Sequence, residues 1–273
     1  MNPTDFSNHL HISHSQLDTF LGCPQKYHYQ YVQGAPWEHL PASLAFGRAI
    51  HAAVAHYYRH LKQFGDPLIL GVLQACFHAE FKEALSKDLE ILYKDGESER
   101  SIREKGDALL EVFSAKVRPQ TIEAVEMPFL VDLVDPATGE ILPTKLAGIF
   151  DLIESDGHGT MGIADLKTSS RRYTERQAEN HLQATLYAYA LRRLGYTTDG
   201  SNILIRFDVL LKTKTPEMES CYAVKAEQDE TWTLVLIRRV LHAIEAGAFT
   251  RYGAGGAASA PSAGDARRTL RRQ

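Results

Sequence analysis

The stretch Met161-Gly162-Ile163-Ala164-Asp165-Leu166-Lys167-Thr168 places an acid and a lysine in an otherwise apolar run. Its composition predicts a strand over 160–168. Because side chains alternate along a strand, Asp165 and Lys167 project from one face, while Ala164 and Leu166 project from the other. A carboxylate and an ammonium group on a buried strand are costly unless they are paired or used in function.

A second acid occupies a similar place upstream. Asp151 stands in Gly148-Ile149-Phe150-Asp151-Leu152-Ile153, within a strand predicted over 141–153 and followed by a turn at Asp156-Gly157-His158-Gly159. If the two strands pair antiparallel, Asp151 approaches Asp165. Two convergent carboxylates are hard oxygen ligands of the kind that Mg²⁺ or Mn²⁺ prefers. An ordinary salt bridge between the lysine and one acid accounts for these residues equally well.

The chain before these strands is predicted to be mostly helical. Ser13 and Gln16 have the spacing of a capping box at the start of a first helix. Further helices are expected over about 45–64 and 68–92. A charged loop around 94–105 leads into another helix that ends near Pro119.

From residue 122 onward the pattern changes to three strands and a helix, followed by two strands and a helix. We expect strands over 122–134, 141–153, 160–168, 202–211 and 220–226, and helices over 175–194 and 229–246. This order predicts an α/β fold, a mixed sheet flanked by helices rather than a Rossmann repeat. We find no internal repeat.

Composition and charge exclude several classes of protein. The 273 residues are 44% hydrophobic and 23% charged, which suits a packed core and excludes wholesale disorder. The net charge of −4 argues against a non-specific nucleic-acid coat but leaves room for a local basic groove. No apolar run reaches the roughly 18 residues of a membrane span. Residues 1–12 lack an apolar signal core, and three scattered cysteines fit a reducing compartment, so a cytoplasmic location is expected.

The sequence suggests three parts: an N-terminal helical region over 1–120, a core over 121–250 and a flexible tail over 251–273. The tail is rich in Gly, Ala, Ser and Pro before it ends in four arginines, Arg267, Arg268, Arg271 and Arg272. Those arginines can contact a phosphate backbone or a protein partner, or serve no specific role.

Several short motifs follow one another along the chain. They are Ile12-Ser13-His14-Ser15-Gln16-Leu17 with Cys23-Pro24-Gln25-Lys26-Tyr27, Phe46-Gly47-Arg48-Ala49-Ile50-His51, Gly148-Ile149-Phe150-Asp151, Asp165-Leu166-Lys167-Thr168 and Gln183-Ala184-Thr185-Leu186-Tyr187. Each is weak alone, but in this order and rough spacing the chain resembles the PD-(D/E)xK nuclease superfamily. The resemblance is to its RecB-like branch, which includes the nuclease domains of RecB and AddB and the CRISPR adaptation nucleases. It extends from Ile12 to about Phe249.

The resemblance implies a metal site. His51, Asp151 and Asp165 would be metal ligands, together with the backbone carbonyl of Leu166. Lys167 would orient or help to deprotonate the attacking water and stabilise developing negative charge. Without the resemblance, a histidine on a helix is more often a packed or surface residue. As a ligand, His51 requires the helical region and the core to pack as one unit.

Further residues are assigned to the same cleft. Gln183 and Tyr187 lie four apart on one helix face and, by resemblance, hold the site or the nucleic-acid strand. Read alone, Tyr187 is a packed side chain and Gln183 a solvated one. Glu126, in a strand of alternating character, is a weaker candidate.

A basic segment follows the Asp-Leu-Lys motif. Arg171, Arg172 and Arg176 stand at the start of a predicted helix and can bind phosphates there. A solvated charge run explains them equally well.

The cysteines depart from the family pattern. Many RecB-like nucleases hold an iron–sulfur cluster with one N-terminal and three C-terminal cysteines. Here Cys23 has the N-terminal place, but only Cys221 follows the Gln183–Tyr187 motif. No iron–sulfur cluster is therefore expected, and Cys23 is interpreted as a small packed residue.

The resemblance implies Mg²⁺- or Mn²⁺-dependent hydrolysis of phosphodiester bonds in DNA, by an exonuclease rather than a site-specific endonuclease. It would leave a 5′-phosphate and a 3′-hydroxyl. DNA repair, recombination or defence are the expected settings, with a helicase or recombination protein as a partner and no membrane association. The alternatives are a non-catalytic module on the same fold that binds nucleic acid or a helicase, and a nuclease that acts on RNA.

Overall fold

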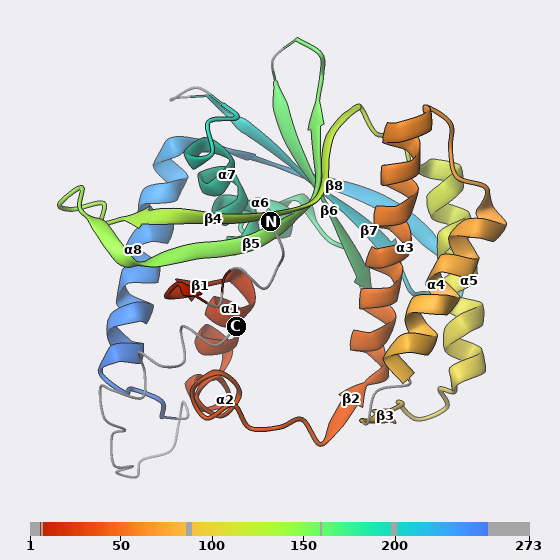
Figure 1. Ribbon diagram of the computed structural model, residues 1–273, viewed down its shortest axis with the longest axis horizontal. Coiled ribbons are helices and arrows are strands. Elements are labelled where there is room, and N and C mark those ends of the chain that lie inside the picture. The colour runs from red at the N-terminus through yellow and green to blue at the C-terminus, as the bar shows by residue number, and fades with distance from the viewer. Residues whose placement is uncertain (1–5, 7, 86–88, 159, 198–200, 251–273) are drawn as a thin grey trace.

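A central mixed sheet with helices on both faces forms the protein, as expected from the sequence (Figure 1). The computed structural model describes residues 6, 8–85, 89–158, 160–197 and 201–250. The predicted α/β class is confirmed. The Arg-ended tail predicted over 251–273 lies outside the described residues.

The sheet is arranged around one long strand. Its strands are β1 (His11–Ile12), β4 (Thr121–Val134), β5 (Ile141–Ser155), β6 (Met161–Ser169), β7 (Ile203–Leu211) and β8 (Glu217–Lys225), in the order β1-β5-β6-β7-β8 with β4 on β5. Strand β4 pairs antiparallel with β5 along its length. On the other edge, β1 pairs with β5 at Lys145 and Leu146, and β6 pairs from Leu152 onward. Within the described residues, positions 147–151 of β5 thus have no strand partner on that edge.

Helices cover the two faces of the sheet. They are α1 (His14–Gly22), α2 (Pro24–Tyr27), a π-helical turn (His28–Val32), α3 (Ala42–Phe64), α4 (Leu70–Leu85), α5 (Glu99–Lys116), α6 (Glu175–Glu179), α7 (Leu182–Arg193) and α8 (Glu227–Glu245). The predicted capping box of α1 is present: Gln16 N–H donates to Ser13 Oγ, and Ser13 N–H donates to Gln16 Oε1. None of the described helices combines the length and apolar character needed to cross a bilayer.

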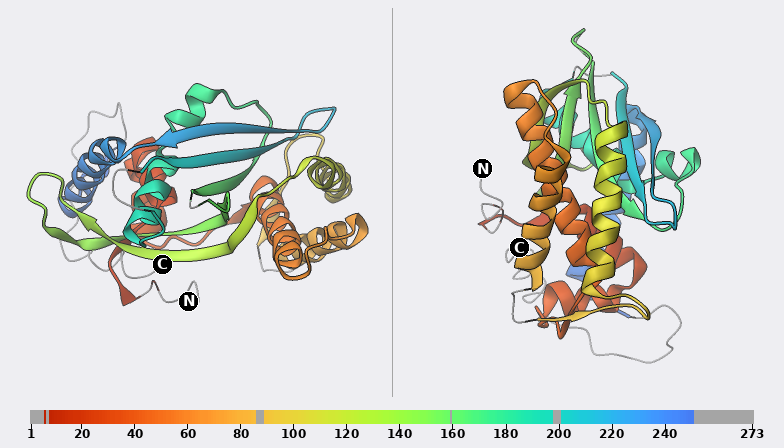
Figure 2. Two further views of the ribbon diagram at one scale, coloured as in Figure 1. Left: turned by 90° about the horizontal axis from the view of Figure 1, so that it is seen from above. Right: turned by 90° about the vertical axis from the view of Figure 1, so that its right-hand side faces the viewer.

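Two apolar cores lie on opposite sides of the sheet. Helices α1, α7 and α8 pack on one face, around Phe150 and Phe207, and α3, α4 and α5 pack on the other (Figure 2). Strand β6 contributes to both, because Ile163 faces the first core while Ala164 and Leu166 face the second. The N-terminal helices thereby share a core with the strands that carry the acids.

The helix predicted over 68–92 is shorter than expected. Helix α4 ends at Leu85, and Glu90–Leu92 form strand β3, which pairs in parallel with β2 (His39–Pro41). The partner strand is distant in the chain, so local periodicity cannot reveal the pairing.

The helix predicted over 175–194 is interrupted. Helix α6 ends where the Asn180 side chain donates to the Arg176 carbonyl, and His181 has an extended backbone before α7 begins. The ring of His181 packs against His14 and Phe207, which explains the break by tertiary contact rather than by propensity.

Gly106 of α5 offers a test of the packing between α4 and α5. A Cβ at this buried position would overlap the ring of Phe77. We expect Gly106→Ala to lower the free energy of unfolding by about 1–3 kcal/mol, because overpacking outweighs the gain in helix propensity. Urea denaturation measures the change.

Gly71 of α4 is the matched control, since a Cβ there meets no atom within 4 Å. Gly71→Ala should leave stability unchanged or raise it by up to about 1 kcal/mol. Equal effects of the two substitutions would contradict the proposed contact.

Candidate active site

Three side chains from distant segments converge beside the unpaired part of β5. They are His51 of α3, Glu126 of β4 and Asp151 of β5, with one ligand atom of each within 4.8 Å of the others. His51 Nδ1 lies 3.3 Å from Asp151 Oδ2, which also accepts a hydrogen bond of 2.9 Å from the Leu166 N–H. One imidazole nitrogen and two carboxylates are a donor set that fits a divalent cation.

Both the backbone and the carboxylate of Glu126 are in energetically unfavourable environments. Its φ of 49° lies in the left-handed region, which costs a non-glycine residue about 1–3 kcal/mol. The neighbouring pairs Val125–Leu152 and Met127–Phe150 place it directly across from Asp151. Burial, and then the charge of Asp151, raise the pKa of Glu126 to about 7. A strained, crowded carboxylate of this kind is typical of a functional site.

The charge of His51 responds to the same cluster. Burial alone would lower the pKa of His51, but the hydrogen bond and charge of Asp151, followed by the charge of Asp165, outweigh it. The pKa of His51 is therefore raised. The cluster is rich in negative charge and favours a bound positive charge.

Asp165 and Lys167 project from the same face of β6, as strand alternation predicted. Lys167 Nζ lies 2.7 Å from Asp165 Oδ2, and Asp165 is only 1% exposed. Burial raises the pKa of Asp165 to about 6 despite the opposing charge of Lys167. Burial alone would lower the pKa of Lys167, but Asp165 and then Asp151 outweigh it and raise the value.

Helix α7 holds this ion pair in place. Gln183 accepts a hydrogen bond of 2.6 Å from Lys167 Nζ and donates one of 2.9 Å to Asp165 Oδ1. The Tyr187 hydroxyl accepts from Gln183 Nε2 at 2.7 Å and donates to the Ile149 carbonyl at 2.8 Å. Both side chains are buried and hydrogen-bonded, so Gln183 is not a solvated residue. Asp165 Oδ2 faces Lys167 Nζ, whereas the hydrogen bonds from Gln183 and Tyr187 go to Oδ1.

The structure thus separates two groups that the resemblance treats as one ligand set. His51, Glu126 and Asp151 form the close cluster, whereas Asp165 is engaged by Lys167, Gln183 and Tyr187. The groups adjoin through the hydrogen bond from Leu166 to Asp151. A ligand role for Asp165 and for the Leu166 carbonyl stays a prediction.

A groove of about 900 Å³ opens onto the cluster. Its wall on α3 includes Arg48, His51, Ala52, Ala55 and Arg59, which recur at the spacing of one helix face. Sequence reasoning did not single out the two arginines, although their spacing from His51 was a usable signal.

The wall opposite α3 comes from Ser15 and Ile149, and α4 adds Glu80. The groove therefore runs between α1 and α3 across β5.

The arginines predicted to bind phosphate are arranged differently. Arg172 pairs with Glu217 at 2.6 Å and also with Glu219. Arg171 and Arg176 are exposed, and α6 is only five residues long. The nucleic-acid role of this segment is a prediction.

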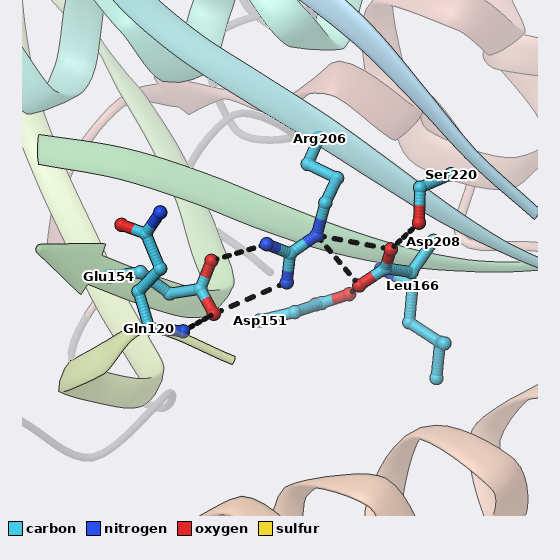
Figure 3. A network of polar contacts seen from close by, with 7 residues as sticks. All are labelled: Gln120, Asp151, Glu154, Leu166, Arg206, Asp208 and Ser220. Atoms are coloured by element: carbon cyan, nitrogen blue, oxygen red, sulfur yellow. Dashed lines mark hydrogen bonds and ion pairs between the residues drawn. The ribbon is translucent and has the colours of Figure 1, made fainter. Parts of the chain in front are cut away.

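A buried polar network braces the strands beside the cluster of His51, Glu126 and Asp151 (Figure 3). Arg206 of β7 contacts Glu154 of β5 at 2.7 Å and Asp208 at 3.1 Å. Strand β6 lies between β5 and β7. Its residues Gly162, opposite Glu154, and Ala164, opposite Arg206, are small enough to let the two side chains meet across it. Losing one member would leave a buried charge unpaired, at a cost of roughly 3–5 kcal/mol. This network was not predicted from the sequence, since Glu154 lies in a different strand from Arg206 and Asp208.

Comparison with solved structures supports the fold. A candidate exonuclease from Eubacterium rectale is 12% identical, with 88% of this chain and 83% of that chain covered and a TM-score of 0.52. The protein SSO0001 is 11% identical over 84% and 82% of the two chains, but its TM-score of 0.32 is too low to support a conclusion. No curated protein matches the sequence.

The family follows from the sequence as a whole. The model of the PD-(D/E)XK nuclease superfamily matches residues 11–254, which include both groups of site residues. The RecB-like branch is a finer assignment and stays a prediction. The acids, the lysine and the mixed sheet thus have their explanation: the chain belongs to the PD-(D/E)XK nuclease superfamily.

Proposed function

We propose that this nuclease is a Mg²⁺- or Mn²⁺-dependent DNA exonuclease whose metal is held at His51, Glu126 and Asp151, beside Asp165 and the Leu166 carbonyl. The observation that carries the proposal is the convergence of one imidazole and two carboxylates, from three separate elements, at the end of a groove. The adjoining Asp165–Lys167 pair supplies a cation within the same site.

The side chains have separable roles in this proposal. A divalent metal, when bound, lowers the pKa of a water ligand and polarises the phosphate. Lys167, fixed by Gln183 and Asp165, stabilises the negative charge that develops on the phosphoryl oxygens. Arg48 and Arg59, along the groove wall, bind phosphates and set the position of the nucleic-acid strand.

The finer parts of the proposal have different support. Exonuclease activity is suggested by the family resemblance and by the description of the Eubacterium rectale neighbour. A role in DNA repair, recombination or defence, with a helicase or recombination partner, follows from the resemblance to RecB-like proteins. Three free cysteines fit a cytoplasmic setting.

A non-catalytic module on this fold is the main alternative. Such a module has no need to keep Asp151, Asp165 and Lys167, nor to hold Glu126 in a strained conformation. The energetic cost of keeping these groups in place favours a catalytic role over a purely binding role. An RNA substrate is a separate alternative that the cleavage assay below resolves.

The first test is cleavage of end-labelled single- and double-stranded, linear and circular DNA, and of RNA, with Mg²⁺ or Mn²⁺. We expect metal-dependent cleavage of DNA that requires an end. Asp165→Asn and Lys167→Ala should each lower kcat by about 100-fold or more, because each removes a group that acts on the transition state. Addition of EDTA should abolish cleavage.

Glu111→Gln is the control, because this acid is exposed on α5, away from the groove. It should cleave like the unaltered protein. Activity that survives Asp165→Asn, or no metal-dependent cleavage on any substrate, would rule out the proposal. If only RNA is cleaved, the substrate is RNA rather than DNA.

The second test measures Mn²⁺ binding by calorimetry. We expect Glu126→Gln to weaken binding by about tenfold or more, because the substitution removes one of two carboxylates from the cluster. Glu80→Gln alters an acid that lines the same groove but lies outside the cluster, and it should bind Mn²⁺ normally. Equal losses in the two variants would mean that Mn²⁺ senses only the general charge of the groove.

A further inference from the structure

A second pocket lies on the other side of Ile149 from the metal cluster. It has a volume of about 380 Å³ and shares Ser15 and Ile149 with the groove. Gln183 and Tyr187, which hold Asp165, form part of its wall. The pocket and the groove are therefore neighbours across the unpaired edge of β5.

The lining of this pocket is mixed. Phe129, Leu146 and Leu186 provide apolar surface, and they are buried. Polar groups come from His14, Ser15 and Gln16 of α1 and from the preceding His11 and Ser13. A cavity that combines apolar surface with polar groups is a common form of a small-molecule site, and this volume is at the low end of the roughly 300–1,000 Å³ range.

His14 gives the pocket an aromatic wall. Its ring lies 5.5 Å from that of His181, which in turn stacks on Tyr173 at 6.4 Å and 21°. Burial, followed by the charges of His181 and Lys167, lowers the pKa of His14 to about 3. The ring is therefore neutral at physiological pH and offers a π-face rather than a positive charge.

We propose that this pocket accepts one unstacked base of the nucleic acid, adjacent to the phosphate at the metal cluster, and that the base packs against His14. A nucleobase has the two properties that the lining matches, a flat π-face and a polar edge. The pocket holds one base and is too small for a base pair with its backbone. The inference rests on the proposed nuclease function.

This arrangement gives the cleft two walls of different chemistry. Phosphates lie along Arg48 and Arg59 on the α3 side, and a base turns into the pocket on the α1 side. Ile149 stands between the two, with its carbonyl already bonded to Tyr187. A nucleic-acid strand that passes over Ile149 thus has one base at the pocket when the adjacent phosphate is at the metal cluster.

The test uses single-stranded oligonucleotides with one abasic residue, moved in turn through the positions around the cleaved bond. The unaltered enzyme should lose about tenfold in kcat/KM at one position only. His14→Ala should lose about as much on the intact substrate and show no further loss with the abasic residue at that position. His14→Phe should retain the activity and the position dependence, since a neutral ring suffices.

Tyr222→Ala is the control, because Tyr222 is a 49%-exposed aromatic residue of β8, away from both the groove and the pocket. It should show the position dependence of the unaltered enzyme. Additive losses for His14→Ala and the abasic residue, or His14→Phe as impaired as His14→Ala, would overturn the inference.

The outcomes also separate this inference from the proposed function. An active enzyme that tolerates an abasic residue equally at every position refutes the base pocket alone. The absence of cleavage on every substrate refutes the nuclease proposal instead. The scan on the unaltered enzyme is informative even if His14→Ala fails to fold.

Discussion

The site depends on a gap in the hydrogen bonding of one strand. Between Leu146 and Leu152, β5 has no strand partner on the edge that β1 and β6 share, within the described part of the chain. Buried backbone groups there must find other partners. The Ile149 carbonyl accepts from the Tyr187 hydroxyl, and the Asp151 carboxylate accepts from the Leu166 N–H. These bonds fix α7 and β6 against β5 while leaving the edge open, and the groove and the second pocket meet there.

The charges around this gap are arranged at a cost in stability. Glu126 occupies a left-handed conformation, and Asp165 is buried with a raised pKa. Such groups persist only where the surrounding structure determines their positions. On the face of the sheet that α3 covers, beside the cluster, Arg206 ties β5 to β7 through Glu154 and Asp208, across the small residues of β6. The rigid sheet thereby holds acids that would otherwise repel one another.

Local rules predicted the parts of the fold whose cause is local. The capping box of Ser13 and Gln16, the strand over 160–168 and the common face of Asp165 and Lys167 follow from short-range geometry. The predictions fail where a distant contact decides the structure. Strand β3 forms because β2 is available to pair, and the helix breaks at His181 because its ring packs against His14 and Phe207.

By itself, the sequence determined the family, through the order of its short motifs, and identified Asp151, Asp165 and Lys167 as the residues to examine. Only the tertiary structure decided how these residues are grouped. Cross-strand register and a positive φ place Glu126 opposite Asp151, and α3 brings His51 to the same point. Asp165 instead joins Lys167 and the side chains of α7. The physical reason is that strand alternation sets which face a residue occupies, whereas its neighbours on that face come from segments that only packing brings together.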